Sequence, residues 1–446
     1  DFSIEEHADG SKTVWCNEVE RMFRTKGMQG FTLYPGKAYI EINVKIYNRT
    51  SFPQTFLWWA NPAVVVNDHY HSVFPPDVNA VFDHGKRDVS SFPIATGVYY
   101  KQDYSAGVDI SKYKNIPVPT SYMAIQSKFD FVGGYEEDVK GGLLHVADHH
   151  VSPGKKQWTW GNGDFGRAWD RNLTDEDGPY IELMTGMYTD NQPDFTWLQP
   201  YEEKSWKQYF MPYAEVGYVK NATKDALLNM EVKEGKGKVI LYTTGVNKDV
   251  HVFVKDNVGG ATLFDKVISI SPAEPFQAEF AAEGLKDEDI LVEIRNHEGR
   301  ILVSYQADKP EIKPVPDPAK AAKDPKDIAS IEQLFLTGQH LEQYRHATYD
   351  PTEYYKEALR REPGDIRCNN AMGLWLMRKG QFAMAEPYFR KAIGTQTERN
   401  PNPYDGEPHY NLGWSCLMQG KTDEAYDAFF KSAWNAAWQD AAYYNL

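Results

Sequence analysis

The sequence is poor in cysteine and lacks any long hydrophobic run. Its three cysteines, Cys16, Cys368 and Cys416, are too few and too scattered for a disulfide framework or a cysteine-rich zinc site. Isolated thiols suit a reducing compartment, which slightly favours the cytoplasm. No apolar run approaches the ~18–20 residues that a membrane-spanning helix requires, so we expect no membrane span in this chain.

Positive charge is also in short supply. The chain has 48 Lys and Arg residues against 63 Asp and Glu residues, which gives a formal net charge of −15 at pH 7. Because phosphate binding requires concentrated positive charge, this balance disfavours nucleic acid as a partner. The chain begins at Asp1 without an initiator methionine or a signal-peptide pattern. We therefore expect the sandwich to be truncated at its N-terminus, and a periplasmic or secreted location stays open.

Aromatic residues, by contrast, are abundant at 14%, and their distribution divides the chain. Eight of the twelve tryptophans precede residue 207, and the other four follow residue 374. Together with the patterns below, this distribution predicts a multidomain protein of β and α parts. Its expected segments are a β-sandwich at 1–215, a small β-sandwich at 216–308, a Pro-rich linker at 309–325 and helical repeats at 326–446.

The first segment has the pattern of strands joined by long loops. Residues 38–47 (AYIEINVKIY) alternate apolar and polar side chains, which is typical of a half-buried strand. Connections rich in Gly, Asn, Asp and Pro span residues 61–93 and 161–179. Loops of this length are uncommon unless they carry function, so we expect binding residues on them.

The pattern of the second segment predicts a small immunoglobulin-like β-sandwich. We expect it to act as a spacer that positions the segments on either side. Its strands include 238–242 (KVILY), 250–254 (VHVFV) and 289–294 (DILVEI), at a spacing typical of such domains. The following stretch, 309–325, holds five prolines and many charges, a composition that indicates an extended, semi-rigid linker.

The last segment repeats itself and resembles the tetratricopeptide repeat. After Gly373 and after Gly413, glycine recurs at +7, alanine at +12 and phenylalanine at +16. Small residues allow two helices to approach closely, and the phenylalanines, Phe389 and Phe429, fill the space between them. The chain stops at Leu446, where the next unit would place its glycine, so we expect the array to be truncated there.

Several strings in the first segment and the repeats resemble a family of bacterial proteins that carry domain of unknown function 5107 followed by tetratricopeptide repeats. The strings include residues 56–62 (FLWWANP), 145–150 (HVADHH), 153–161 (PGKKQWTWG), 178–183 (GPYIEL), 189–193 (TDNQP), 343–346 (QYRH) and 434–440 (WNAAWQD). The resemblance implies a galactose-mutarotase-like supersandwich, a fold shared by sugar epimerases and other carbohydrate-active enzymes. Asn61-Pro62 stands roughly where mutarotases carry an Asn-His pair, so one sugar-binding histidine of that group is absent.

Glu182 and a nearby histidine are the candidate catalytic pair. Glu182 is flanked by apolar residues, and a carboxylate in such surroundings exchanges protons near neutral pH. His145, His149 and His150 lie just upstream, and imidazole serves as acid or base around pH 7. The alternative interpretation is a structural carboxylate and hydrogen-bonded loop histidines.

Aromatic and polar side chains supply candidate substrate contacts. Flat indole rings bury the apolar face of a pyranose with little entropy loss, although adjacent tryptophans more often divide between core and surface. Acidic and guanidinium groups suit hydroxyls or an acidic sugar, and a salt-bridged loop is the alternative. The candidates are Trp58, Trp59, Asn61, His71, Trp158, Trp160, Asp164, Arg167, Trp169 and Gln192.

The sequence thus predicts a carbohydrate-active protein that acts on a glycosidic or anomeric centre by Glu/His acid–base catalysis. If it is an enzyme, it is similar to a glycoside hydrolase or a sugar epimerase. The repeat array is expected to pack on or near the site. The alternative is a non-catalytic sugar-binding scaffold whose repeats bind a protein partner. We predict no cofactor and no metal site. The alternative is a zinc site formed by His69, His71 and the histidines of 145–150, because residues i and i+2 share one face of a strand.

Overall fold

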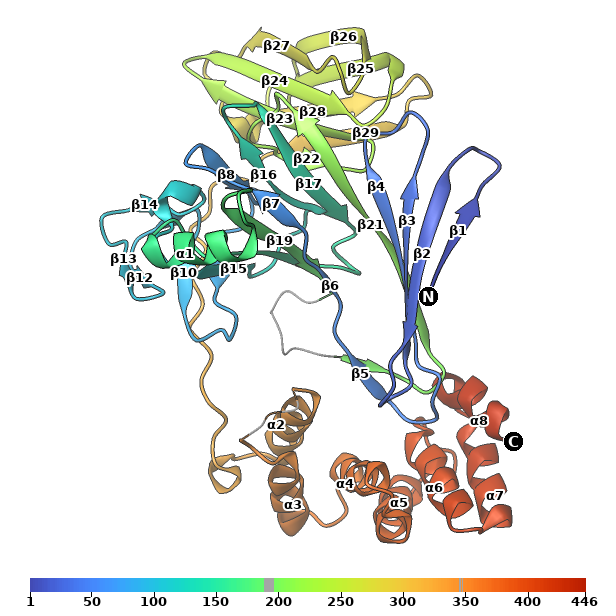
Figure 1. Ribbon diagram of the computed structural model, residues 1–446. Coiled ribbons are helices and arrows are strands. Elements are labelled where there is room, and N and C mark those ends of the chain that lie inside the picture. The colour runs from blue at the N-terminus through green and yellow to red at the C-terminus, as the bar shows by residue number, and fades with distance from the viewer. Residues whose placement is uncertain (188–195, 345, 347) are drawn as a thin grey trace. The chain divides into compact units, whose positions relative to one another are not determined.

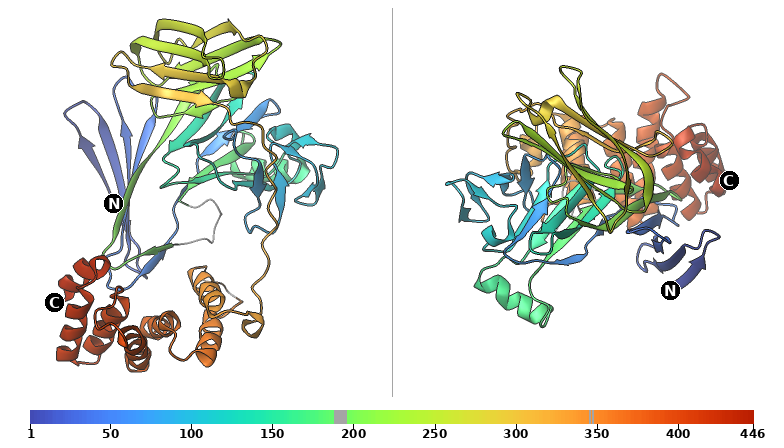
Figure 2. Two further views of the ribbon diagram at one scale, coloured as in Figure 1. Left: turned by 180° about the vertical axis from the view of Figure 1, so that it is seen from behind. Right: turned by 90° about the horizontal axis from the view of Figure 1, so that it is seen from above.

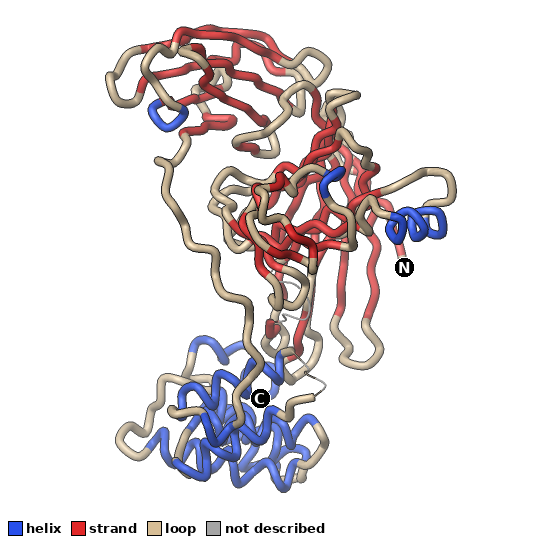
Figure 3. Tube along the Cα trace, turned by 90° about the vertical axis from the view of Figure 1, so that its left-hand side faces the viewer, coloured by secondary structure: helices blue, strands red, loops and turns tan. Residues whose placement is uncertain are grey.

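The computed structural model describes residues 1–187, 196–344, 346 and 348–446. Contacts within the chain group these residues into two units, each built from several chain segments. The first comprises Asp1–Tyr47, Leu57–Gln192 and Glu203–Ala319, and the second comprises Asn48–Phe56, Pro193–Glu202 and Lys320–Leu446. The first unit is mainly strands and the second mainly helices (Figure 3).

Two antiparallel sheets form the N-terminal sandwich of the first unit (Figure 1). Val44 and Phe210 of one sheet share a core with Tyr122 and Leu183 of the other, so the predicted sandwich is confirmed. The first sheet has the order β1 (Phe2–Glu6), β2 (Lys12–Val19), β3 (Lys26–Leu33), β4 (Ile40–Tyr47), β21 (Glu203–Ala214), β17 (Gly141–Ala147), β16 (Phe131–Glu136) and β8 (Tyr70–Val73).

The second sheet of the sandwich carries the candidate catalytic carboxylate. Its order is β10 (Val89–Ser91), β9 (Ala80–Phe82), β15 (Thr120–Ala124), β18 (Gly154–Thr159), β19 (Tyr180–Gly186) and β6 (Trp59–Ala60), with β7 (Ala63–Val65) also paired to β19. Short ribbons in the loops pair β11 (Ile94–Ala95) with β14 (Val108–Asp109) and β12 (Val98–Tyr99) with β13 (Gln102–Asp103).

The second β module is a sandwich of two four-stranded sheets around its own apolar core, as predicted (Figure 2). It packs on the first sandwich through a further core that joins Leu227 and Tyr242 of the module to Met211 and Leu144 of the eight-stranded sheet. Its sheets are β22 (Asn221–Ala222), β23 (Ala226–Lys233), β24 (Lys236–Thr243) and β27 (Phe276–Ala281), then β26 (Thr262–Ile270), β25 (Asn247–Asp256), β28 (Ile290–Arg295) and β29 (Ile301–Gln306).

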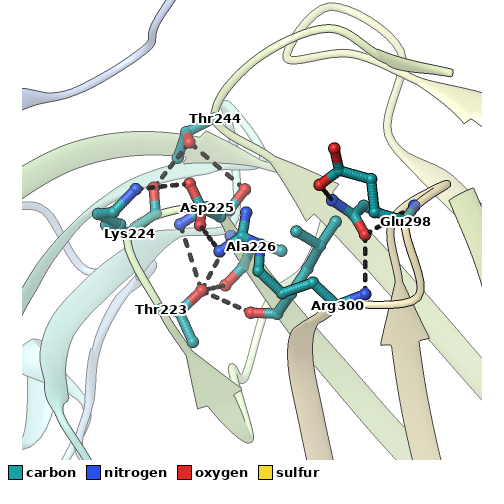
Figure 4. A network of polar contacts seen from close by, with 9 residues as sticks. Thr223, Lys224, Asp225, Ala226, Thr244, Glu298 and Arg300 are labelled. Carbon is teal, nitrogen blue, oxygen red and sulfur yellow. Dashed lines mark hydrogen bonds and ion pairs between the residues drawn. The ribbon is translucent and has the colours of Figure 1, made fainter.

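A polar network closes one end of this module (Figure 4). Asp225 accepts hydrogen bonds from Lys224 Nζ at 2.9 Å and from Arg300 at 3.1 Å, and the Thr244 hydroxyl donates to the Lys224 carbonyl at 2.7 Å. Partial burial raises the pKa of Asp225, but the two cations outweigh it and the net pKa is lowered. The network therefore fixes the turn between β22 and β23 beside the loop that ends in Arg300.

The second unit contains the predicted helical repeats. In all three helix pairs a glycine faces an aromatic ring: a Cβ at Gly373 would overlap Phe389, one at Gly413 would overlap Phe429, and one at Gly338 would overlap Tyr355. The helices are α2 (Ile331–Gln343), α3 (Pro351–Arg361), α4 (Ile366–Arg378), α5 (Phe382–Thr397), α6 (Glu407–Met418), α7 (Thr422–Ser432) and α8 (Gln439–Asn445). Within the described residues, no helix is both long enough and apolar enough to cross a membrane.

Two segments far upstream in the sequence pack with these helices. They pair as the short ribbon of β5 (Gln54–Phe56) and β20 (Thr196–Leu198). Phe52 lies against Trp414 with ring centroids 5.8 Å apart, and the Tyr410 hydroxyl donates to the Ser51 carbonyl at 3.1 Å. The helical unit is therefore completed by residues that precede it by more than a hundred positions.

Candidate functional site

A row of three side chains crosses the outer face of the seven-stranded sheet. Ser121 on β15 is paired with Trp158 on β18, and Trp158 is paired with Glu182 on β19. Directly paired residues of antiparallel strands share one face, and their neighbours Tyr122 and Leu183 point into the core between the sheets. The three side chains therefore project away from that core, with the half-buried indole of Trp158 between the other two.

Glu182 is oriented by a neighbouring amide. Asn61 Nδ2, in the loop between β6 and β7, donates to Glu182 Oε2 at 2.9 Å. A carboxylate has two oxygens that accept hydrogen bonds, and the bond from Asn61 uses only Oε2. Asn61 and Glu182 are the predicted site residues that the structure joins by a direct hydrogen bond.

A histidine that sequence analysis missed stands at the other end of the row. His84 Nδ1 is hydrogen-bonded to the Ser121 hydroxyl. Burial lowers the pKa of His84, and nearby Lys156 lowers it further while Asp83 raises it. Two strand spacings of about 4.8 Å each, roughly 10 Å in total, separate the backbones of Ser121 and Glu182. His84, bonded to Ser121, and the Glu182 carboxylate therefore lie on opposite sides of Trp158.

The tryptophans extend this face toward helix α1 (Asp164–Leu173). Trp158 and Trp160 meet edge to face at 4.4 Å, and Trp160 stacks on Trp169 at 4.9 Å with an interplanar angle of 11°. Trp160 Nε1 donates to the Tyr180 hydroxyl at 3.2 Å. Gly166 allows this packing because a Cβ there would overlap the backbone of residues 160 and 161. The result is a continuous aromatic surface next to Glu182.

The adjacent tryptophans 58 and 59 divide between core and surface, the pattern that the sequence favours for such pairs. Trp58 packs against the core between the sheets, and its Nε1 donates to Gln208 Oε1 at 3.4 Å. Trp59 is exposed on β6, which pairs with β19 beyond Glu182. Trp58 is thus a packing residue, while Trp59 is accessible near the row.

His71 has a structural position. It is 2% exposed, stacks on Tyr218 with centroids 3.8 Å apart, and lies 5.5 Å from the Tyr135 ring. Burial lowers its pKa to about 4, so it is neutral at pH 7. Its partners belong to or adjoin the core beneath the second β module, which is not the face that carries Glu182.

The three predicted catalytic histidines do not lie in the row. His145 is buried between the two sheets against Phe210, and burial lowers its pKa to about 3. His149 and His150 occupy the turn before Gly154, which pairs with Gly186. Glu182 is four residues from Gly186 along β19, about 13 Å at ~3.3 Å per residue. The pairing of Glu182 with one of these histidines stays a prediction, and the register favours His84 instead.

Asp164 and Arg167 lie on α1, and Arg167 lines a concavity of about 610 Å³. Asp164 is exposed at the start of the helix, and Arg167 Nε donates to the Asn162 carbonyl at 3.0 Å. Asp170 lines the same concavity and is 5% exposed, its Oδ1 has no hydrogen-bond partner in the described chain, and burial raises its pKa. Gln192 falls outside the described residues.

Potential metal ligands gather at two places in the described chain. Ligand atoms of Asp148, His149 and His150 lie within 4.8 Å of one another, as do those of Glu386, Cys416 and Glu424. The second cluster already holds two cations, because Glu386 accepts from Arg390 at 2.8 Å and from Lys421 at 2.6 Å. The first cluster offers two imidazoles.

His84 and Ser121 were missed for a definite reason. Alternation along 120–124 shows that Ser121 and Tyr122 face opposite sides, but only the register of β15 against β18 and β19 places Ser121 in line with Glu182. The signal available in the sequence was His84 itself, in an Asp-His-Gly turn after a short apolar strand.

Comparison with known proteins agrees with the expected family resemblance. Residues 1–213 match the family model described as Domain of unknown function (DUF5107), and residues 221–305 match that of the YphG-like protein, second domain. A TPR-domain containing protein from Parabacteroides distasonis is similar in structure, with 15% identity, a TM-score of 0.41, 96% of this chain covered and 58% of that chain. This chain therefore spans little more than half the length of that protein.

Two further solved structures are similar over about half of this chain. A galactose mutarotase-like protein from Lactobacillus casei has 12% identity and a TM-score of 0.33, with 48% of this chain and 73% of that chain covered. A galactose mutarotase related enzyme from Lactobacillus acidophilus has 12% identity and a TM-score of 0.32, with 48% and 72% covered.

Proposed function

We propose that the outer face of the seven-stranded sheet binds a carbohydrate over Trp158, with Glu182 and His84 as proton-exchanging groups at its two edges. The observation that carries this proposal is the row Ser121–Trp158–Glu182, with His84 bonded to Ser121. The reaction class that suits it is acid–base chemistry at an anomeric or glycosidic centre.

The chemistry of the three groups supports a sugar ligand. A pyranose presents an apolar face of C–H groups, and a half-buried indole takes such a face with little loss of rotamer freedom. Hydroxyls at the ring edge require acceptors and donors, which the Glu182 carboxylate and the Asn61 amide supply. The carboxyl groups of sugar-cleaving sites lie at most ~9.5 Å apart, a scale comparable with the spacing across this row.

The protonation state of His84 fits a role as base. Its lowered pKa leaves the imidazole neutral at pH 7, so one ring nitrogen is unprotonated and can accept a proton. Glu182 is fixed by Asn61 at the opposite edge and interacts with the same bound ring. His84 therefore replaces the histidines of 145–150 in the acid–base pair.

Turnover separates an enzyme from a sugar-binding scaffold. We would screen monosaccharides and oligosaccharides by NMR for anomeric exchange or bond cleavage, using the full chain and its Glu182→Gln and His84→Gln variants. Removal of an acid–base group lowers kcat by ~10²–10⁴-fold, so both variants should be nearly inactive. Glu18→Gln, which changes an exposed strand glutamate, is the matched control.

The non-catalytic alternative gives a different result in the same screen. A scaffold would bind a sugar over Trp158 without any change in its anomeric or glycosidic signals. Full activity in both Glu182→Gln and His84→Gln would refute the catalytic assignment.

A second candidate function concerns the helical unit. We infer that helices α4, α6 and α8 bind the segments around β5 and β20 of the same chain, in place of a protein partner. Arg378 of α4 lies 4.7 Å from the Trp197 ring centroid, and Tyr444 of α8 lies 4.4 Å from the Tyr201 ring. With the contacts of Phe52 and Tyr410, these interactions run from α4 to α8, so an external peptide would compete for the same side chains.

A further inference from the structure

The turn between β17 and β18 presents two imidazoles side by side. Asp148, His149 and His150 form this turn, and its backbone is closed by bonds from the Val151 and Ser152 amides to the Asp148 carbonyl at 3.0 and 2.8 Å. The His149 and His150 ring centroids are 4.0 Å apart with an interplanar angle of 38°. Two adjacent side chains thus place four ring nitrogens within a small volume.

Each imidazole is held by a carboxylate through the same nitrogen. His149 Nδ1 lies 2.7 Å from Asp130 Oδ1, and His150 Nδ1 lies 2.9 Å from Asp148 Oδ1. Backbone amides reinforce both pairs, because the His149 N–H donates to Asp130 and the His150 N–H donates to Asp148, each at 2.9 Å. In the described chain neither Nε2 has a hydrogen-bond partner, so both Nε2 atoms remain available.

This is the arrangement that metal-binding histidines adopt. A ligating imidazole donates its other ring N–H to a carboxylate, which fixes the tautomer and makes the ligating nitrogen more basic. Asp130 and Asp148 act on the two rings in this way. One ring nitrogen of His149 and one of His150 also lie within 4.8 Å of each other, so the two rings are close enough to share one ion.

We propose that the 148–150 turn binds one divalent transition-metal ion of the zinc class through Nε2 of His149 and Nε2 of His150, with Asp130 and Asp148 as the supporting carboxylates. Imidazole donors favour Zn²⁺, Ni²⁺ and Cu²⁺ over Mg²⁺ and Ca²⁺, which prefer oxygen. Two imidazole ligands leave the remaining positions of a four-coordinate ion to water. The site is separate from the row at Trp158 and is independent of the proposed sugar chemistry.

The surroundings of the turn are compatible with a cation. The His150 side chain is 77% exposed and that of His149 is 25% exposed, so an ion reaches both from solvent. Asp130 and Asp148 supply two negative charges. The opposing charge is Lys155, which Asp130 influences electrostatically and whose pKa burial lowers to about 8. Two carboxylates against one ammonium group leave the turn negative.

Zinc titration of the full chain tests the assignment. Isothermal titration calorimetry with ZnCl₂ should give one site per chain, and Co²⁺ should give the visible absorption of a four-coordinate centre. His149→Ala and His150→Ala should each weaken Zn²⁺ binding at least tenfold, and Asp130→Asn by ~10–100-fold through loss of outer support. Ca²⁺ at the same concentrations should give no heat.

The matched control is His251→Ala. His251 Nε2 lies 2.6 Å from Asp265, and its 37% exposure falls between the values of the two turn histidines, but no second imidazole of the described residues adjoins it. Its loss should leave the zinc affinity unchanged. Equal affinities for the wild-type chain, His149→Ala and His150→Ala would overturn the proposal, as would a loss in His251→Ala as large as theirs.

Discussion

Trp158 lies directly opposite Glu182 on neighbouring antiparallel strands, and both side chains leave the sheet on the face away from the core. Side chains so paired have Cβ atoms about 5 Å apart, which is contact distance for an indole and a carboxylate. A ring stacked on Trp158 would therefore have the Glu182 carboxylate at its edge. The same register places Ser121 and His84 on the other side.

Acid pH should inactivate the protein through His84. Burial depresses its pKa below that of an exposed histidine, so the neutral base is present at pH 7 and is lost as the pH falls through that lowered value. We expect kcat to be flat near neutrality and to fall at acid pH, as measured by a pH series with the sugar identified in the NMR screen. An activity that rises as the pH falls would exclude His84 as the base.

His145 should make the fold sensitive to acid. Its folded-state pKa of about 3 lies below that of an exposed histidine, so the unfolded chain takes up this proton first. The contribution of His145 to the free energy of unfolding is fully present above about pH 6.5. It decreases by about 1.4 kcal/mol per pH unit as the pH falls toward 3.

The His145→Phe variant isolates this contribution. Urea midpoints measured between pH 7 and pH 4 should decline less steeply in the variant than in the wild-type chain. An unchanged slope would show that His145 is protonated, or reached by water, in the folded state.

The glycine–aromatic contacts of the repeats predict that alanine at two glycines changes stability in opposite directions. Gly373→Ala places a methyl group into the Phe389 ring, and overpacking of this kind destabilises by about 1–3 kcal/mol. Gly394→Ala in α5 meets nothing within 4 Å, so it should stabilise by about 0.5–1 kcal/mol through helix propensity. Thermal unfolding of both variants tests this, and equal shifts would contradict the packing.

The β5–β20 ribbon should lose protection from amide hydrogen exchange when its aromatic contact with the helices is removed. Trp414→Ala deletes the ring that packs on Phe52, so amide hydrogen exchange in residues 51–56 should accelerate. The control is Trp434→Ala, an exposed tryptophan that contacts Lys431. If Trp414→Ala leaves exchange in 51–56 at the wild-type rate, the helices do not hold the ribbon.

Local patterns predicted the parts of this fold that depend on local spacing. The glycine and phenylalanine at fixed positions after Gly373 and Gly413 identified the repeats, because each pair meets across two consecutive helices. The predicted strands at 238–242 and 250–254 lie within β24 and β25, and the one at 289–294 begins one residue before β28, since alternation and β-branched residues determine them locally.

The candidate site could be predicted from local sequence patterns only in part. Glu182 could be identified as a strand carboxylate, but its face and its neighbours depend on pairing with β18 and β7, which strand sequences do not specify on their own. His145 precedes Glu182 by 37 residues, and it lies between the sheets because β17 belongs to the other sheet. The ribbon pairs residues 54–56 with 196–198, a separation that no short-range pattern encodes.

Sugar binding by tryptophan variants tests the central assignment most directly. The measurement is the dissociation constant, by calorimetry, of the sugar selected in the NMR screen for the full chain, Trp158→Ala and Trp15→Ala. Trp15 is a half-buried strand tryptophan whose Nε1 bonds to Glu5, far from the row along the sequence. We predict that Trp158→Ala weakens binding roughly tenfold or more, because stacking adds about 1 kcal/mol to the burial that is lost, and that Trp15→Ala leaves it unchanged. Unaltered affinity in Trp158→Ala would contradict the site.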